Sequence, residues 1–138
     1  MCGICGKLYH SRDRSVDGEL LRSMISVINH RGPDDEGIYV KNNVGLAHKR
    51  LSILDLSPAG HQPMSNEDGT VWLVFNGEIY DFQGLRERLK SNGHTLKSLT
   101  DTETIIHLYE DEGIECLKHL NGMFAFALWD GRLQKLWL

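Results

Sequence analysis

Five consecutive apolar residues at positions 71–75, Val-Trp-Leu-Val-Phe, stand out because no polar residue interrupts them. The run is too short to cross a membrane as a helix. A continuous apolar run of this length is typical of a strand that is buried on both faces. Both sides of its sheet must then be covered, which favours a layered architecture.

Strand patterns lie on both sides of this run, and helix patterns lie between them. Strands are predicted at 3–9, 37–40 and 44–53, and a hairpin at 123–138 with a two-residue type I′ turn at Asp130 and Gly131. Helices are predicted from Asp17 to Asn29, at 82–91, at 100–113 and at 114–120. Two groups of antiparallel strands with helices between them indicate an α+β layered sandwich.

Two further segments carry expectations about exposure. In 44–53, the alternation puts His48, Arg50 and Ser52 on one side of the strand, which predicts a sheet with one polar face. Segment 57–69 contains two prolines and two glycines, which predicts a long loop.

The composition is that of an ordinary soluble globular protein of one domain, residues 1–138. Charged residues make up 25% and hydrophobic residues 41%, and the net charge of −4 gives no basic surplus for binding nucleic acid or an anionic membrane. No apolar run reaches the length of a signal sequence or a spanning helix, so we expect a cytoplasmic protein without a membrane partner. Three cysteines cannot pair evenly, which fits a reducing compartment. Because Leu138 closes a hairpin arm without a polar tail, we expect the chain to end inside its domain.

The N-terminus offers a nucleophile with its own base. Aminopeptidases remove an initiator Met when a small residue follows, so Cys2 can become the first residue and carry both a thiol and a free α-amine. An α-amine with a pKa of about 7.7 to 8.0 can accept the thiol proton near neutral pH. The ordinary alternative is a small buried Cys at the start of a strand.

Other polar residues have the chemistry of a substrate site, although each also has an ordinary explanation. Arg50 can hold a carboxylate in a two-point fork, or form a surface ion pair. The Asn76 amide and the Gly77 N–H are donors of the type that stabilises an oxyanion, or they form a plain Asn-Gly turn after the buried strand. Asp101 can receive an ammonium ion, or complement a helix dipole. Arg31 can position a loop, or pair with a neighbouring Asp.

Taken together, these residues resemble the class II glutamine amidotransferase domain, and more narrowly the N-terminal glutaminase domain of glutamine-hydrolysing asparagine synthetase. The resemblance covers essentially the whole chain. Its motifs are Met-Cys-Gly-Ile-Cys-Gly at 1–6, His-Arg-Gly-Pro-Asp at 30–34, the island from Arg-Leu-Ser-Ile to His-Gln-Pro-Met at 50–64, Phe-Asn-Gly-Glu-Ile-Tyr at 75–80, Thr-Asp-Thr-Glu at 100–103 and Phe-Ala-Phe-Ala-Leu-Trp-Asp at 124–130.

The resemblance implies an N-terminal-nucleophile hydrolase fold, a four-layer αββα sandwich that is truncated on its C-terminal side. It also implies that Cys2 is the nucleophile, that its amine is the base once Met1 is removed, and that Asn76 and the Gly77 N–H form the oxyanion hole. A retained Met1 would leave the site inactive. The alternative members of the family serve amino-sugar or polysaccharide biosynthesis.

The resemblance further implies how glutamine binds and what lies outside this chain. Arg50 would bind the α-carboxylate, and Glu78 and Asp101 the α-ammonium. The domain itself would need no metal or cofactor, whereas the complete enzyme would use ATP and Mg²⁺ in a C-terminal synthetase domain to amidate aspartate. The oligomeric state is left open, with a homodimer as one expectation.

Two readings compete with the hydrolase. Cys2-x-x-Cys5 matches a redox or zinc pair, but no second Cys pair is present and no two histidines have the spacing typical of metal ligands. A non-enzymatic module would keep the fold without turnover, and replacing Cys2 by Ala would then leave its biological effect unchanged.

Overall fold

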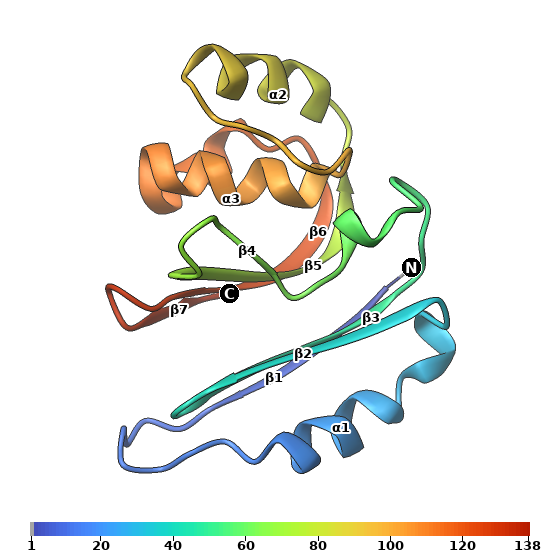
Figure 1. The fold of residues 1–138 in the computed structure, drawn as a ribbon, viewed down its shortest axis with the longest axis vertical. Helices are drawn as coiled ribbons and strands as arrows, with labels where there is room; N and C mark the ends of the chain where they lie inside the picture. The colour runs from blue at the N-terminus through green and yellow to red at the C-terminus, as the bar shows by residue number, and fades with distance from the viewer. Residues whose placement is uncertain (1) are drawn as a thin grey trace.

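The computed structural model describes residues 2–138, which form four stacked layers. Figure 1 shows helix α1 (Gly18–Ser26) under one sheet, and a second sheet covered on its far side by helices α2 (Phe82–Ser91) and α3 (Asp101–Glu112). The α+β four-layer order predicted from the sequence is therefore confirmed. None of the helices within residues 2–138 has the length and apolar composition needed to cross a bilayer.

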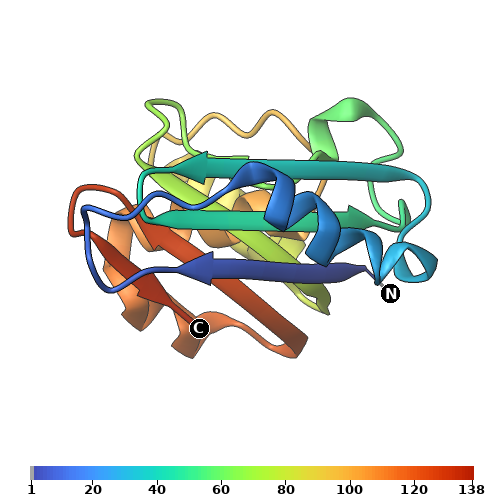
Figure 2. The same cartoon turned by 90° about the horizontal axis from the view of Figure 1, so that it is seen from below.

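The first sheet is built from strands β1 (Gly3–Leu8), β2 (Asp35–Lys41) and β3 (Val44–Arg50), in the antiparallel order β1-β3-β2. Figure 2 shows α1 lying along the outer face of this sheet, with the strands of the second sheet crossing behind at an angle. Asp17 begins α1 as predicted, because its carboxylate accepts a hydrogen bond from the Glu19 N–H. A short 3-10 helix, η1 (Asn29–Arg31), follows.

The second sheet has the order β4-β5-β6-β7 and is also antiparallel. Its strands are β4 (Met64–Ser65), β5 (Val71–Ile79), β6 (Gly122–Asp130) and β7 (Lys135–Trp137). Two 3-10 helices, η2 (Pro58–Gly60) and η3 (Gly113–His119), complete the chain. Segment 57–69 is thus not wholly irregular, since it contains η2 and β4.

Strand β5 forms the centre of the molecule. Its even-numbered residue Val74 packs with Val44, Leu46, Ala127 and Trp129 between the two sheets. Its odd-numbered residues Val71, Leu73, Phe75 and Ile79 pack under α2 and α3. The apolar run at 71–75 is accordingly covered on both faces, as predicted, with only Trp72 half-exposed.

Strand β5 is longer than the sequence indicated, and this changes the setting of the candidate site. The predicted strand ended at Phe75, and an Asn-Gly turn was the ordinary alternative for the following residues. Instead, Asn76, Gly77 and Glu78 continue the strand and pair with Ala125, Phe124 and Met123 of β6. A Cβ atom at Gly77 would lie only 2.4 Å from the Phe124 Cβ, so a glycine permits this close pairing.

Strand β3 has no polar face, which makes that prediction wrong. All seven of its residues are buried, because α1 covers one side and the second sheet covers the other. The polar side chains find partners inside: His48 Nε2 donates to the Phe75 carbonyl oxygen at 3.1 Å. The alternation of polar and apolar residues in the sequence therefore assigned side chains to the two faces of β3, but it did not show that both faces are buried.

The last hairpin also differs from its prediction. Asp130 pairs with Lys135, so a four-residue turn replaces the predicted two-residue turn. The Asp130 carboxylate accepts hydrogen bonds from the backbone N–H groups of Arg132 and Leu133. Gln134 closes the turn with a φ of 54°. The longer turn therefore arises because the Asp130 side chain satisfies turn donors within the loop.

His48 should make stability depend on pH. Its ring is fully buried between the sheets, and burial lowers the pKa of His48 to about 4. Between about pH 6.5 and pH 4 the unfolded chain therefore binds a proton that the folded chain does not, and the free energy of unfolding falls as the pH falls. We expect a loss of about 3 kcal/mol across this window, at roughly 1.4 kcal/mol for each pH unit.

Urea unfolding at pH 7 and pH 4.5 measures this effect, with His48→Gln as the comparison because Gln does not titrate. We expect a shallower pH dependence in the variant, whatever its stability at pH 7. Equal pH dependence in both proteins would show that His48 does not titrate abnormally.

Candidate active site

One pocket at the shared end of the two sheets collects all six residues that the sequence singled out for catalysis and substrate binding. Cys2 lies just before β1, Arg50 ends β3, and Asp101 begins α3. Asn76, Gly77 and Glu78 come from the far half of β5. The pocket encloses about 140 Å³, below the roughly 300 to 1,000 Å³ of sites for drug-sized ligands. It therefore suits a small ligand.

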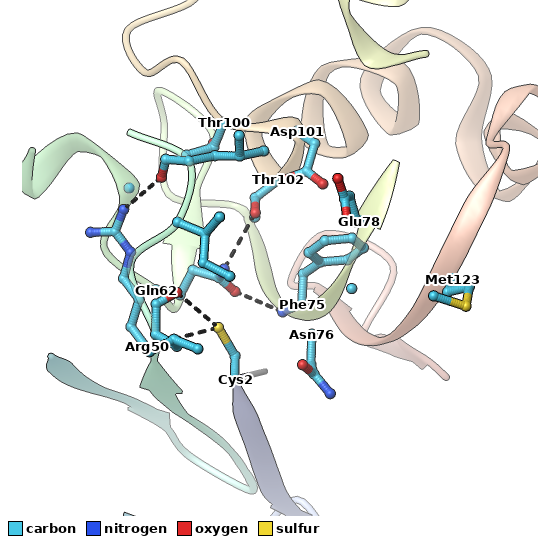
Figure 3. Close-up of a pocket in the computed structure, with 15 residues that line it drawn as sticks. Cys2, Arg50, Gln62, Phe75, Asn76, Glu78, Thr100, Asp101, Thr102 and Met123 are labelled. Carbon is cyan, nitrogen blue, oxygen red and sulfur yellow. Dashed lines mark hydrogen bonds between the residues drawn. The ribbon is translucent and has the colours of Figure 1, made fainter. Parts of the chain in front are cut away.

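Figure 3 shows how these side chains are arranged around the pocket. Cys2 and Asn76 lie in the lower part of the view, Arg50 lies to their left, and Glu78 and Asp101 lie above and to the right. A nucleophile and an amide donor thus line one pocket, together with a cation and two carboxylates. A ligand that carries a carboxamide, a carboxylate and an ammonium group matches these charges.

The Cys2 thiol is held by the backbone that follows β3. The Leu51 N–H donates to Cys2 Sγ at 3.3 Å, and Sγ lies 3.7 Å from the Leu51 carbonyl oxygen. These two contacts orient the sulfur toward the pocket. Met1 lies outside the described residues. The predictions that it is removed, and that its retention would leave the site inactive, therefore stay predictions.

Arg31 positions the N-terminus. Its Nε donates to the Cys2 carbonyl oxygen at 2.9 Å. The neighbouring carboxylates bind elsewhere: Asp34 accepts from the Ser52 N–H, and Asp35 pairs with His61. These contacts fit the first interpretation of Arg31, a positioning role, rather than an ion pair with a neighbouring Asp.

The Gly77 N–H lies on an open edge of β5. The β5–β6 register runs without a bulge from Val71↔Asp130 to Ile79↔Gly122, so successive N–H groups alternate between the two edges of β5. The Phe75 N–H donates to Gln62 Oε1 at 2.7 Å, and the Ile79 N–H donates to Asp101 Oδ2 at 2.9 Å. The Gly77 N–H points to the same edge, away from β6.

This edge of β5 is open because β4 reaches only Trp72 and Leu73. Gly77 is exposed, and no side chain among residues 2–138 accepts from its N–H. Gln62 and Asp101 accept from the N–H groups of the neighbouring odd-numbered residues of β5, and the Gly77 N–H between them is left for a ligand. This is a preorganised donor of the kind that binds an oxyanion.

Asn76 projects from the opposite face of β5 to Phe75, toward the first sheet. Its side chain is half-buried, and no partner for its amide occurs in the described part of the chain. A side-chain amide and a backbone N–H on adjacent residues are therefore both without a partner in the pocket that Cys2 lines.

Arg50 is buried, and a loop binds most of its guanidinium. Nη1 donates to the Ser57 carbonyl oxygen at 3.1 Å, and Nη2 donates to the carbonyls of Leu54 and Asp55. A guanidinium has five N–H donors, so Nε and one proton of Nη1 are left for a ligand. The predicted two-point fork is already occupied in part by the chain itself.

The two carboxylates differ in exposure. Glu78 is exposed, whereas Asp101 is buried and accepts from the Ile79 N–H. Burial raises the pKa of Asp101, and the negative charge of Glu78 raises it further. An ammonium group between them would offset both effects.

Comparison with known proteins decides the family. A family model described as the glutamine amidotransferase domain matches residues 1–138. This chain belongs to the class II glutamine amidotransferase domain family. An asparagine synthetase (glutamine-hydrolyzing) 2 of Bacillus subtilis (strain 168) is 41% identical and covers 100% of this chain, and a probable asparagine synthetase (glutamine-hydrolyzing) of Dictyostelium discoideum is 44% identical and covers 94%.

The amidotransferase domain spans about a fifth of these relatives, 18% and 23% of their lengths. Among solved structures, glutamine phosphoribosylpyrophosphate amidotransferase from B. subtilis aligns with a TM-score of 0.75 and 19% identity, covering 93% of this chain and 35% of that chain. This likeness confirms the N-terminal-nucleophile hydrolase fold.

Two residues of the amidotransferase pocket were missed by sequence reasoning. Gln62 is buried and joins β5 to α3, since its Nε2 donates to Thr102 Oγ1 at 3.3 Å. Gly60 lies against Arg50, and a Cβ there would be 2.0 Å from Arg50 Nη2. Both lie in segment 57–69, which its prolines and glycines marked only as a loop.

The Cys-x-x-Cys reading finds no support in this amidotransferase domain. Cys2 and Cys5 are both free thiols. Cys2 lines the active-site pocket, whereas Cys5 lines a different, mainly apolar pocket beside Leu46 and Phe126. The two sulfurs therefore face different surroundings.

Proposed function

We propose that this amidotransferase domain hydrolyses L-glutamine to glutamate and ammonia, with Cys2 as nucleophile. The single observation that carries the proposal is the free Gly77 N–H on the open edge of β5, in the pocket that Asn76 and Cys2 also line. This arrangement provides a reacting sulfur and two donors for the oxygen that becomes negatively charged.

In the proposed reaction, the α-amine of a mature N-terminal Cys2 takes the thiol proton, and the sulfur adds to the side-chain carbonyl carbon of glutamine. Asn76 and the Gly77 N–H stabilise the oxyanion. The carbon–nitrogen bond breaks, the amine proton passes to the leaving group, and ammonia departs. Water then hydrolyses the glutamyl thioester and restores the thiol.

Substrate selection follows from the walls of the pocket. We assign the α-carboxylate of glutamine to Arg50, through its remaining N–H groups, and the α-ammonium to Glu78 and Asp101. A buried carboxylate such as Asp101 discriminates strongly, because it is left unpaired when a ligand lacks the ammonium group.

For the complete protein we propose the glutaminase role of an asparagine synthetase. The two synthetases cited above support this assignment by their identity to this chain. Ammonia would then pass to a C-terminal synthetase domain that uses ATP and Mg²⁺ to amidate aspartate. A cytoplasmic location and a homodimer belong to the same proposal.

A second candidate is the glutaminase domain of another amidotransferase with a different ammonia acceptor. The observation that favours it is the relative Amidase chry2 of Gibberella zeae, which is 40% identical and covers 99% of this chain. The residues of the Cys2 pocket would have the same roles in either case.

The assay that tests the function supplies L-glutamine to the purified protein and measures glutamate and ammonia. We expect equal amounts of both products, and no hydrolysis of analogues that lack the α-ammonium or the α-carboxylate. A folded protein with a free N-terminal Cys2 that released no ammonia would favour the non-enzymatic module.

Arg50→Ala tests the assignment of the α-carboxylate. We expect the KM for glutamine to rise by roughly 10- to 100-fold, because a hydrogen bond to a charged group contributes about 1.5 to 3 kcal/mol. Arg50→Lys should recover only part of the lost affinity for glutamine, since a lysine does not reproduce the planar guanidinium. Unchanged KM values in both variants would place the carboxylate elsewhere.

A further inference from the structure

A second cluster of ligating side chains lies outside the Cys2 pocket, between α3 and the segment that follows α2. His94, His107 and Glu110 each offer one atom, and these atoms all lie within 4.8 Å of one another. None of the three residues lines the Cys2 pocket. The cluster is therefore separate from the proposed glutaminase chemistry.

The fold brings these residues together although their spacing matches no metal motif. His107 and Glu110 are three positions apart on α3, so they share one face of the helix. Gly93 turns the chain after α2 with a φ of 97°, and the His94 N–H then donates to the Leu89 carbonyl oxygen. This turn places the His94 ring against the His107 ring, with centroids 4.7 Å apart.

Three atoms of the cluster converge on a common point. His107 Nδ1 donates to Glu110 Oε2 at 2.8 Å, and Glu110 Oε2 lies 3.9 Å from His94 Nδ1. A bound metal ion would replace the proton on His107 Nδ1. Ligands about 2.0 to 2.2 Å from a tetrahedral zinc ion are roughly 3.3 Å from one another. Two of the separations lie on either side of that value and the third is within 4.8 Å, so the side chains must rotate to bind an ion.

His94 and Glu110 each form a hydrogen bond to a neighbouring residue through the atom that does not face the cluster. His94 Nε2 lies 2.8 Å from Asp111 Oδ1, and a carboxylate accepts, so Nε2 carries the proton and Nδ1 presents its lone pair to Glu110. Glu110 Oε1 accepts from Asn66 Nδ2 at 2.8 Å. Histidine and carboxylate ligands of metal ions are typically oriented by outer partners of this kind.

The surrounding charge favours a cation. Besides Glu110 and Asp111, the carboxylates of Glu67 and Glu103 each lie 3.9 Å from His107 Nε2. Two positive charges lie near them: Lys97 Nζ is 3.9 Å from Glu67, and the buried Arg86 Nη1 is 3.7 Å from Glu103. The side chains are shielded but reachable, with 3% of His107, 18% of His94 and 22% of Glu110 exposed.

We propose that His94 Nδ1, His107 Nδ1 and Glu110 Oε2 bind a divalent transition-metal ion of the zinc class, with water completing the shell. Two imidazoles and one carboxylate suit Zn²⁺, Ni²⁺ or Cu²⁺ rather than Mg²⁺, which prefers oxygen ligands. The ion would tie the segment after α2 to α3. Glu103, one turn before His107, already binds the N–H groups of Lys97 and Ser98 in that segment.

Isothermal titration of the metal-free protein with ZnCl₂ tests this site. The titration uses a Cys2→Ala/Cys5→Ser background, because accessible thiolates would bind zinc themselves. We expect one ion per chain, at least tenfold weaker binding in His94→Ala and in the isosteric Glu110→Gln, and about 10- to 100-fold weaker binding in Asp111→Asn. MgCl₂ should give no comparable binding.

His119→Ala is the matched control, since His119 also pairs with a carboxylate, Glu112, but lies outside the cluster. Its zinc affinity should equal that of the background protein. Circular dichroism establishes that each variant is folded, and Glu110→Gln provides a second answer if His94→Ala is not. Absence of saturable binding, or equal affinity in a folded His94→Ala or Glu110→Gln variant and in the control, would overturn the proposal.

Discussion

Cys2→Ala abolishes glutamine-dependent ammonia release in the complete protein, while synthesis from added ammonia continues. The loss is expected to be on the order of 10⁶ in turnover, as when the nucleophile is removed from a comparable acyl-transfer site. Ala is small enough for Met1 to be removed normally, so the variant keeps a free α-amine and lacks only the sulfur. The rate of glutamate formation from glutamine measures the first half of the prediction, and asparagine formed from aspartate, ATP and added ammonium salt measures the second.

Cys5→Ala is the control for this substitution. Cys5 is partly exposed on β1, in an apolar pocket distinct from the active site, and burial raises the pKa of its thiol. We expect its glutaminase rate to remain close to that of the parent. Full glutaminase activity in Cys2→Ala would show that the proposed mechanism is wrong.

Asn76→Ala is expected to lower glutamine turnover by about 10² to 10³, with a smaller effect on KM. The reason is that the amide acts on the oxyanion, which is present in the transition state and absent from bound glutamine. Steady-state kinetics separates the two parameters, and a circular dichroism spectrum checks the fold. Gly77 is unsuited to this test, because a side chain there would collide with the backbone of Phe124.

Asn121→Ala provides the matched control, since Asn121 is an exposed Asn just before β6. Its backbone carbonyl accepts from the Tyr80 N–H, and truncating its side chain leaves that bond intact. We expect unchanged kinetics. A rise in KM with unchanged turnover in Asn76→Ala would mean that Asn76 binds glutamine without stabilising the oxyanion.

Much of the layered fold could be predicted because local patterns and burial agree. The apolar run at 71–75 required cover on both faces, and β5 has that cover. The end of β5 could not be predicted, because Asn76 and Gly77 are poor strand formers and are held in the strand by pairing with distant β6.

The membership of the candidate site was predictable, but its geometry was not. All six residues proposed from the sequence line one pocket. What the sequence could not show is that Gln62 and Asp101 occupy the donors on either side of the Gly77 N–H. The contacts of Arg50 with the loop carbonyls depend likewise on a segment without regular periodicity.

The His94–His107–Glu110 cluster illustrates the same limit for ligating residues. Spacing along the chain indicated no metal site, because the glycine turn after α2, rather than a motif, brings His94 to α3. A site that is assembled from separate elements and carries no recognised motif is found only once the elements are placed.

The most direct measurement is mass spectrometry of the mature protein after treatment with a glutamine analogue that carries an electrophile in place of the side-chain amide. We expect a chain that has lost Met1, one analogue attached per chain, and fragment ions that place the analogue on the sulfur of Cys2. Modification of another residue, or normal ammonia release by a chain that still carries Met1, would contradict it.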